Sequence, residues 1–231
     1  MEHVQKVKFS TDSLCVTRED KARHVHDKYK TILTGKILDV GADQCFLKNY
    51  LDENKSSYVG IGMNSDNLDI NVNLESECIP FPDSTFDCVL CLDVLEHLEN
   101  IHHTFNELCR VSKRYVIISL PNPWACLWKS QRTGDYKLDQ HIKFYGLPVE
   151  KPSDRHRWFF SAEEAFRFIV NMANSNSMRI VQMDNEGVIE GGNIFWRSLK
   201  RIAFRIIFAR GFNPKNLSIT SIWTVLEKCK I

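Results

Sequence analysis

The stretch that decides the fold is KILDVGAD, at residues 36–43. Ile37, Leu38 and Val40 form a short apolar run, and Gly41 follows it directly. Such a run before a glycine is typical of a buried strand that leads into a tight turn, because glycine adopts the left-handed backbone that these turns need. The pattern predicts the first strand of an open α/β fold, followed by a ligand-binding loop.

Further apolar runs follow along the chain, and segments with helical spacing separate most of them. Strands are predicted at 36–40, 57–61, 68–74, 86–92, 114–120, 178–183 and 218–227. Helices are predicted at 17–33, 44–51, 100–111, 161–173 and 193–209, with Thr17 and Ser161 as N-caps. This alternation predicts a mostly parallel sheet with helices on both faces, whose ligand binds at the carboxyl ends of the strands beside the first strand.

Two segments carry less regular signals. The third strand is expected to be half-buried, because Leu68, Ile70, Val72 and Leu74 alternate along it. The segment 124–157 is long, polar and aromatic, has few periodic signals, and contains several glycines and prolines. A segment of this length within a compact domain is more often functional than accidental.

Composition restricts the class of protein. The chain has 231 residues, of which 43% are hydrophobic, so it suits one domain with a full core. Its formal net charge of +1 gives no overall field that would attract nucleic acid. Neither a signal peptide nor a membrane-spanning helix is expected, because no apolar leader or apolar stretch of about 18 residues is present. Eight scattered cysteines, several in apolar runs, favour a reduced, cytoplasmic protein.

Cys88 and Cys91 form a C-x-x-C pair within the fourth predicted strand. Side chains alternate along a strand, so these two thiols are expected to point to opposite faces. A metal site would also need a second ligand pair, and none has suitable spacing. The sequence therefore predicts buried core at this pair, and no metal site.

A second block, IPFPDSTFD at 79–87, is followed by DVLEHL at 93–98. With residues 36–43, these blocks resemble the class I S-adenosylmethionine-dependent methyltransferases of the small "type 11" kind. The resemblance is clearest over residues 36–123. It implies an α/β, Rossmann-like sheet of seven mostly parallel strands with an antiparallel last strand, helices on both faces, and a lid or insertion after strand 5. It also implies S-adenosylmethionine as cofactor and S-adenosylhomocysteine as product.

On this resemblance, residues 1–231 form a single domain with four parts. These are an N-terminal helical extension at 1–34, a cofactor-binding half at 35–123, a substrate-side insertion at 124–160, and a C-terminal half at 161–231.

The first loop departs from the family pattern Asp/Glu-x-Gly-x-Gly-x-Gly. Asp39 and Gly41 are kept, whereas Asp43 and Cys45 replace the second and third glycines. Asp tolerates a left-handed backbone better than most residues, so the turn is expected to survive. Asp43 is also a candidate cap for the next helix. An ordinary turn from strand to helix is the alternative interpretation.

The resemblance implies four places that line the cofactor pocket. They are the first loop (Asp39, Gly41, Ala42, Asp43), the end of the second strand (Gly62, Met63, Asn64), the segment Asn73, Leu74 and Glu75, and the end of the fourth strand (Leu92, Asp93, Val94). Gly62 stands where the family usually has an acidic residue for the ribose hydroxyls. Either Asn64 or Asp66 substitutes for it from a shifted position, or both are turn residues. Leu74 either offers its amide to adenine or is only core.

Three histidines are candidates for catalysis or for positioning the acceptor: His97, His141 and His156. Imidazole titrates near neutral pH and suits a base. His97 follows Glu96 in the Leu-Glu-His-Leu turn, and the other two lie in the insertion, where aromatic and charged residues mix. A structural role for each histidine is the alternative.

The main hypothesis is methyl transfer to a small molecule or to a glycan or lipid precursor. The alternative is a methyltransferase-like fold that has weakened or lost cofactor binding and acts as a binding or regulatory module. A nucleic-acid methyltransferase is disfavoured by the near-zero charge and by the lack of an Asn/Asp-Pro-Pro-aromatic motif. The basic amphipathic segment 193–209 either packs on the sheet or contacts a membrane surface peripherally.

Overall fold

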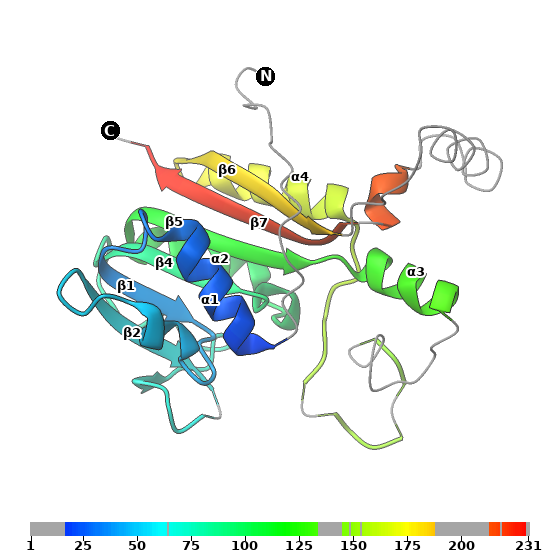
Figure 1. The fold of residues 1–231 in the computed structure, drawn as a ribbon, viewed down its shortest axis with the longest axis horizontal. Helices are drawn as coiled ribbons and strands as arrows, with labels where there is room; N and C mark the ends of the chain where they lie inside the picture. Colours follow the sequence, from blue (N-terminus) through cyan, green and yellow to red (C-terminus); the bar gives the residue numbers. More distant parts are fainter. Residues whose placement is uncertain are drawn as a thin grey trace.

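The computed structural model describes residues 17–63, 65–133, 145–147, 149–152, 154–187, 213–217 and 219–229. Within these ranges the chain builds one seven-stranded sheet in the order β3-β2-β1-β4-β5-β7-β6 (Figure 1). The strands are β1 (Gly35–Val40), β2 (Ser56–Gly62), β3 (Ile70–Asn71), β4 (Phe86–Leu92), β5 (Ser112–Pro121), β6 (Met178–Gly187) and β7 (Ile219–Lys228). The helices are α1 (Arg18–Tyr29), α2 (Ile101–Val111), α3 (Pro123–Thr133) and α4 (Ala162–Ser175), with 3-10 turns η1 (Phe46–Tyr50), η2 (Leu95–His97) and η3 (Pro214–Leu217).

The sheet is mostly parallel, as predicted. β1 pairs in parallel with both β2 and β4, and the pairs β2–β3 and β4–β5 are also parallel. The last strand, β7, runs antiparallel to β5 and β6. The strand order reverses at β1, so the switch point of the sheet lies at the carboxyl end of β1, between β2 and β4.

Helices cover both faces of the sheet, which confirms the fold class. One core layer contains Val25 and Tyr29 of α1 with Ile37 of β1, and the other contains Phe105 of α2 and Ile169 of α4 with Leu38 of β1. In Figure 1, α1 crosses the near face, and α2 and α4 lie behind the strands. None of the helices in the described ranges is long and apolar enough to cross a bilayer.

The C-x-x-C pair shows how the strand period sorts side chains between these layers. Cys88 belongs to the layer under α1 and Cys91 to the layer under α2, and both thiols are fully buried. The prediction of opposite faces and a core role for these cysteines is therefore confirmed.

Both predicted N-caps are confirmed. The Thr17 hydroxyl accepts a hydrogen bond from the Asp20 amide, and the Asp20 carboxylate accepts one from the Thr17 amide. Ser161 and Glu164 form the same reciprocal arrangement at the start of α4. Each capping box satisfies amides that would otherwise lack a partner in the first turn, which fixes where the helix begins.

Three predictions about elements need correction. The helix expected at 44–51 is the 3-10 turn η1, because the left-handed Cys45 precedes it and no side chain caps it. The strand expected at 68–74 shortens to the two residues of β3, where Ile70 is exposed. The segment after β5 begins with a helix that was not predicted, α3, whose Trp124 amide donates to the Asn122 side chain. An Asn cap before Pro123 at the first helical position is a start signal that the sequence did contain.

Two further predictions cannot be compared with the structure. The helix expected at 193–209 and the first 16 residues lie outside the described residues.

Gly41 is required by both its backbone and its neighbour. Its φ is +79°, and a Cβ at this position would lie 2.3 Å from Cγ2 of Val94. We predict that Gly41→Ala lowers the free energy of unfolding by roughly 2–4 kcal/mol in urea titrations, from strain plus overpacking. Gly62→Ala is the matched control, because its Cβ would make only ordinary contacts at 3.4 Å or more, and it should change stability by less than about 1 kcal/mol. Equal effects of the two substitutions would contradict this account.

Candidate active site

The first loop keeps a glycine-type backbone although two of its three glycines are missing. Gly41, Asp43 and Cys45 have φ values of 79°, 49° and 54°, so every second residue is left-handed. Five non-glycine residues in the described ranges have positive φ, and Asp43, Cys45 and Asp93 all lie at this edge of the sheet. Strained backbone of this kind persists where its surroundings impose it, and it gathers at functional sites. The expectation that the turn survives is confirmed.

Contacts from β2 and α1 hold this loop. The amides of Gly41 and Ala42 donate to the Ile61 carbonyl at the end of β2, at 2.7 and 3.1 Å. The Asp43 carboxylate pairs with Arg18 at the start of α1. Asp43 was a candidate cap for the next helix, but that turn has no side-chain cap and its N-cap position is Cys45, so the capping role is wrong. Asp43 instead ties the loop to α1.

Asp39 is a buried acid near the end of β1. Its side chain accepts a hydrogen bond from the Tyr58 hydroxyl at 2.8 Å, and only 8% of the residue is exposed. Burial raises the pKa of Asp39 to about 6, against the opposing effects of the Tyr58 hydrogen bond and the Lys21 ammonium. Asp39 therefore holds a negative charge at neutral pH that the fold solvates poorly.

Asp93 follows β4 and has a left-handed backbone with φ of 52°. Its carboxylate pairs with Lys21 of α1 and accepts a hydrogen bond from the Ser119 hydroxyl of β5 at 2.5 Å. Burial acts to raise the pKa of Asp93, but Lys21 and Ser119 outweigh it and hold the pKa below its ordinary value. Asp93 is thus a stable carboxylate at the carboxyl edge of the sheet.

Lys21 is a site residue that the sequence reasoning missed. Its ammonium lies against Asp93, 3.4 Å from the Ser119 hydroxyl and 5.1 Å from the centre of the Trp223 ring. Within α1 it is one turn from Val25, which is fully buried. That spacing places Lys21 next to the core-facing stripe of the helix, and it was the available signal that this lysine points at the sheet.

The other predicted cofactor residues divide into two groups. Met63 directly follows β2 and is half-exposed, and Leu74 is buried. In contrast, the Glu75 carboxylate accepts the amides of Glu99 and Asn100 just before α2, and the Asn73 side chain accepts the Glu75 amide. Asn73 and Glu75 therefore order a turn and a helix start, and the pocket-lining role expected of them stays a prediction.

Leu92, Val94, Asp66 and Asn64 complete the predicted pocket. Leu92 is half-buried at the end of β4, and Val94 packs on Gly41. Asp66 is exposed in the turn after β2, and Asn64 lies outside the described residues.

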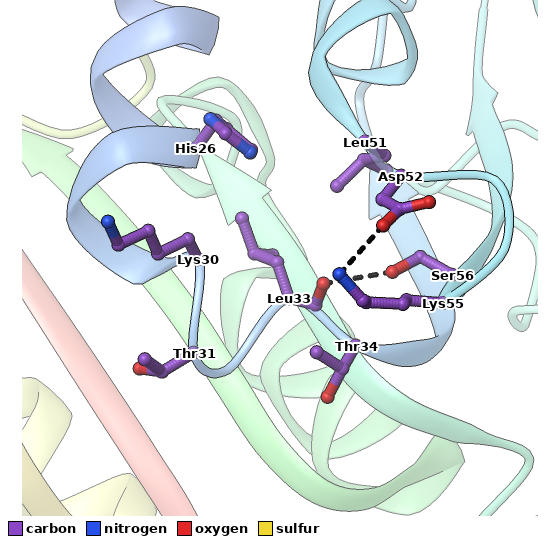
Figure 2. Close-up of a pocket in the computed structure, with 9 residues that line it drawn as sticks. All are labelled: His26, Lys30, Thr31, Leu33, Thr34, Leu51, Asp52, Lys55 and Ser56. Atoms are coloured by element: carbon purple, nitrogen blue, oxygen red, sulfur yellow. Dashed lines mark hydrogen bonds and ion pairs between the residues drawn. The ribbon is translucent and has the colours of Figure 1, made fainter.

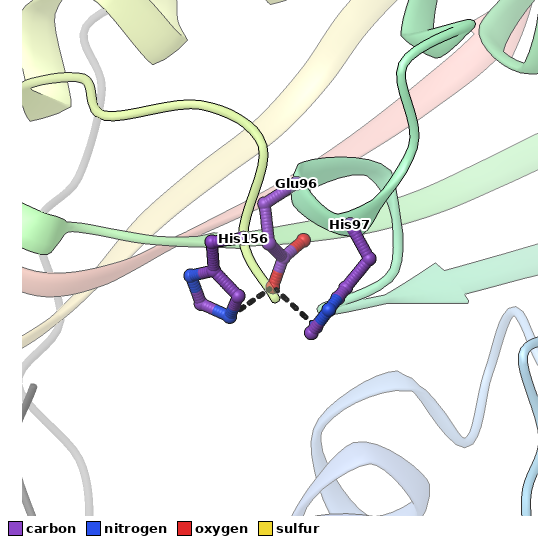
Figure 3. A group of neighbouring side chains, drawn as sticks. All are labelled: Glu96, His97 and His156. Carbon is purple, nitrogen blue, oxygen red and sulfur yellow. Dashed lines mark ion pairs between the residues drawn. The ribbon is translucent and has the colours of Figure 1, made fainter. Parts of the chain in front are cut away.

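Two of the three predicted histidines meet beside a buried acid. The rings of His97 and His156 are 4.5 Å apart, and their Nε2 atoms lie 3.9 and 4.0 Å from Oε1 of Glu96 (Figure 3). Glu96 is fully buried in η2, directly after the end of β4. The segment that carries His156 is held there because the Arg157 amide donates to the Glu96 carbonyl at 2.8 Å. His141 lies outside the described residues.

A surface pocket on the opposite edge of the sheet does not fit the predicted ligand site. It lies where α1 ends and where β1 and β2 begin, and Lys55 and Asp52 form a 2.8 Å ion pair at its rim (Figure 2). Ligands of open α/β sheets bind at the carboxyl ends of the strands, and this pocket is at the amino ends. The charged cluster around Asp39, Asp93 and Lys21 is therefore the better candidate site.

The comparisons with known proteins agree with this placement. The sequence pattern of a family described as methyltransferase domain matches residues 17–167, which is more than half of the chain. The chain belongs to this family. Its sheet order and its antiparallel last strand are those that the resemblance to class I methyltransferases implied for the fold. None of the proteins with curated functions matches the sequence significantly.

Several solved structures share the fold of this chain. An S-adenosylmethionine-dependent methyltransferase from Archaeoglobus fulgidus superposes with a TM-score of 0.59 at 16% identity, covering 91% of this chain and 94% of that one. The magnesium protoporphyrin IX methyltransferase from Synechocystis, solved with S-adenosylhomocysteine bound, gives 0.54 at 14% identity over 91% and 83%. The cyclase SpnF gives 0.54 at 12% identity over 98% and 87%. At these identities the likeness concerns the fold alone.

The raised pKa of Asp39 predicts a pH-dependent stability. A carboxyl group whose pKa is raised by folding contributes to stability. The contribution is fully present below the unfolded pKa of about 4 and is lost as the pH rises through the folded pKa of about 6. We predict that Asp39→Asn, compared with the native chain in urea unfolding, gains about 3 kcal/mol of relative stability between pH 4 and pH 8. The exposed Asp52, whose pKa is lowered mainly by its hydrogen bond with Lys55, gives the control Asp52→Asn, which should show no such gain. A pH-independent difference for Asp39→Asn would contradict the prediction.

Proposed function

We propose that this methyltransferase binds S-adenosylmethionine at the carboxyl ends of β1 and β4 and transfers its methyl group to a small-molecule, glycan or lipid-linked acceptor. The observation that carries the proposal is the set of paired opposite charges beside the left-handed first loop. These are Lys21 with Asp93, and Arg18 with Asp43, with Asp39 close to Lys21.

This set of charges suits a zwitterion. The amino-acid end of the cofactor carries an ammonium and a carboxylate, and its sulfonium adds a second positive charge. Asp39 and Asp93 would take the ammonium, and Lys21 would take the carboxylate. Binding would then exchange one ion-pair partner for another, so every buried charge keeps a counter-charge. A buried charge without a counter-charge would cost about 3–5 kcal/mol.

The adenosine end has weaker support. Met63 and Leu74 would contact the adenine, and the left-handed loop from Gly41 to Cys45 would bring backbone close to the ligand. Gly62 supplies no carboxylate for the ribose hydroxyls. Losing one charged hydrogen bond weakens binding by about 1.5–3 kcal/mol, or roughly ten- to a hundredfold. That loss leaves micromolar binding within reach if the charged end is intact.

Methyl transfer makes modest chemical demands on the protein. The acceptor atom, the methyl carbon and the sulfur must be held in line, and bulk water must be kept out. No covalent protein intermediate is needed. α1 covers the charged end of the site through Arg18 and Lys21, and the segment around His156 closes on η2 beside the end of β4. The acceptor would reach the methyl group between α1 and the segment around His156.

Aromatic residues of the insertion would line the acceptor side. Phe159 packs against both Trp124 and Tyr145, with ring centres 5.7 and 5.3 Å apart. Trp124, Trp158 and Phe159 keep between 36% and 48% of their surface exposed. Half-exposed aromatic rings with polar neighbours suit a compact organic acceptor.

A binding or regulatory module is the competing function. It is favoured by the two missing loop glycines and by the missing ribose carboxylate at Gly62. The two functions differ in whether the site binds the cofactor, so a binding measurement separates them.

The decisive experiment is calorimetric titration with S-adenosylhomocysteine. We predict micromolar affinity for the native chain. Lys21→Met should weaken it ten- to a hundredfold, because the ligand carboxylate loses its cation. The ligand 5′-methylthioadenosine lacks the amino-acid end, so its affinity should be the same for both proteins.

The matched control for this titration is Lys30→Met, at the exposed end of the same helix, which should bind both ligands as the native chain does. Absence of heat at millimolar S-adenosylhomocysteine would contradict the proposed enzyme and favour the binding module.

A further inference from the structure

The cluster of Glu96, His97 and His156 has the composition of a metal site. One donor atom from each residue lies within 4.8 Å of the other two, in the described part of the chain. Glu96 is fully buried, yet neither of its carboxylate oxygens has a hydrogen-bond partner among the described residues. A buried carboxyl group without a hydrogen bond either stays protonated or needs a positive charge close to it.

The hydrogen bonds behind the two imidazoles orient their Nε2 atoms. His97 Nδ1 lies 2.7 Å from the Asp154 carboxylate, which only accepts, so Nδ1 carries the proton. The Tyr145 hydroxyl has the Trp158 carbonyl as an acceptor for its proton at 3.3 Å, which leaves its oxygen able to accept from a protonated His156 Nδ1 at 2.7 Å. Both rings then present an Nε2 lone pair on the side that faces Glu96 (Figure 3). A carboxylate or hydroxyl behind a histidine is the usual support of a metal-binding imidazole.

The spacing suits an ion better than direct hydrogen bonds. Distances of 3.9 and 4.0 Å from the imidazole nitrogens to Glu96 Oε1 are too long for hydrogen bonds. Ligand atoms bound to one ion by bonds of about 2.1 Å lie roughly 3–4 Å apart, so a small closing movement of the side chains completes the site.

We propose that Glu96, His97 and His156 bind one divalent transition-metal ion, with open coordination positions that hold the acceptor's hydroxyl oxygen. Two imidazoles and one carboxylate suit Mn²⁺, Fe²⁺, Co²⁺ or Zn²⁺ better than Ca²⁺ or Mg²⁺. This assignment replaces the expectation from the sequence that the chain has no metal site. It also changes the role of His97 and His156 from bases to ligands.

The position of the cluster connects the ion to methyl transfer. Glu96 follows Asp93 by three residues, and Val94 between them packs on Gly41 of the first loop. An oxygen held at Glu96 would therefore lie beside the site proposed for the cofactor. The acceptor part of the proposal rests on the proposed function, whereas the metal site does not.

The reaction at the metal would be the O-methylation of the bound hydroxyl group. The metal lowers the pKa of the bound hydroxyl, whose proton passes to solvent water. An oxygen lone pair forms the bond to the methyl carbon, and the carbon–sulfur bond breaks with its electron pair left on sulfur. The products are a methyl ether, neutral S-adenosylhomocysteine and one proton.

The test uses the full chain, stripped with a chelator, dialysed and titrated with Mn²⁺ and Co²⁺ by calorimetry and visible absorption. We expect one ion per chain, a Co²⁺ d–d band, and a rise in melting temperature with either ion. His156→Ala and Glu96→Gln should weaken binding at least tenfold, and Asp154→Asn about ten- to a hundredfold. His102→Ala, an exposed imidazole on α2 outside the cluster, should bind as the native chain does.

Failure of the stripped native chain to bind either ion at millimolar concentration would overturn the metal site. Unchanged metal affinity in His156→Ala would also overturn it. His156 lies in the segment before α4, so this variant leaves the buried Glu96 in place and keeps the test valid if Glu96→Gln does not fold. Water-proton relaxation with bound Mn²⁺ tests the open positions: enhancement supports them, and its absence overturns the acceptor assignment. Loss of S-adenosylhomocysteine binding with intact Mn²⁺ binding would refute only the proposed methyl transfer.

Discussion

Two carboxylates, Asp39 and Asp93, lie at the ends of neighbouring parallel strands, and one ammonium group, that of Lys21, lies close to both. Burial acts to raise the pKa of each carboxyl group, and the Lys21 ammonium acts against that rise at both, together with the Tyr58 hydroxyl at Asp39 and the Ser119 hydroxyl at Asp93. α1 supplies that cation. Its capping box, its buried Val25 and Tyr29, and its Arg18 pair with Asp43 fix the start of the helix at the carboxyl edge. The arrangement of the site, from the first loop to the proposed ligand, depends on these ion pairs.

The loop conformation shows that a sequence motif can be lost while its geometry persists. Asp43 and Cys45 adopt the backbone that glycines adopt without strain. The strain is held by hydrogen bonds to the Ile61 carbonyl, by the Arg18 pair, and by Val94 packed against Gly41. Missing glycines are therefore weak grounds for inferring a lost fold. Replacing the two glycines with Asp43 and Cys45 restricts the backbone conformations open to the loop, so ligand affinity is the property to measure.

Local sequence pattern was enough for much of the fold. Alternation at Cys88 and Cys91, apolar runs such as Ile37–Val40, and the caps at Thr17 and Ser161 all act within a few residues, and the structure agrees with each. The site was less accessible, because Lys21 and Asp93 are 72 residues apart and only the folded sheet brings them together. The same holds for Tyr145 and Asp154, which orient His156 and His97. The 3-10 turn η1 differs from prediction because the left-handed Cys45 precedes it without a side-chain cap, and β3 is shorter than its apolar alternation predicts.

The central claim is that the charges around Lys21 form the receptor for a zwitterionic cofactor. A crystal structure of the full chain grown with S-adenosylhomocysteine tests it most directly. The account predicts the ligand at the carboxyl ends of β1 and β4, with its carboxylate on Lys21 and its ammonium on Asp39 and Asp93. An unchanged Lys21–Asp93 pair with no ligand at that edge, or a ligand bound elsewhere, would contradict it.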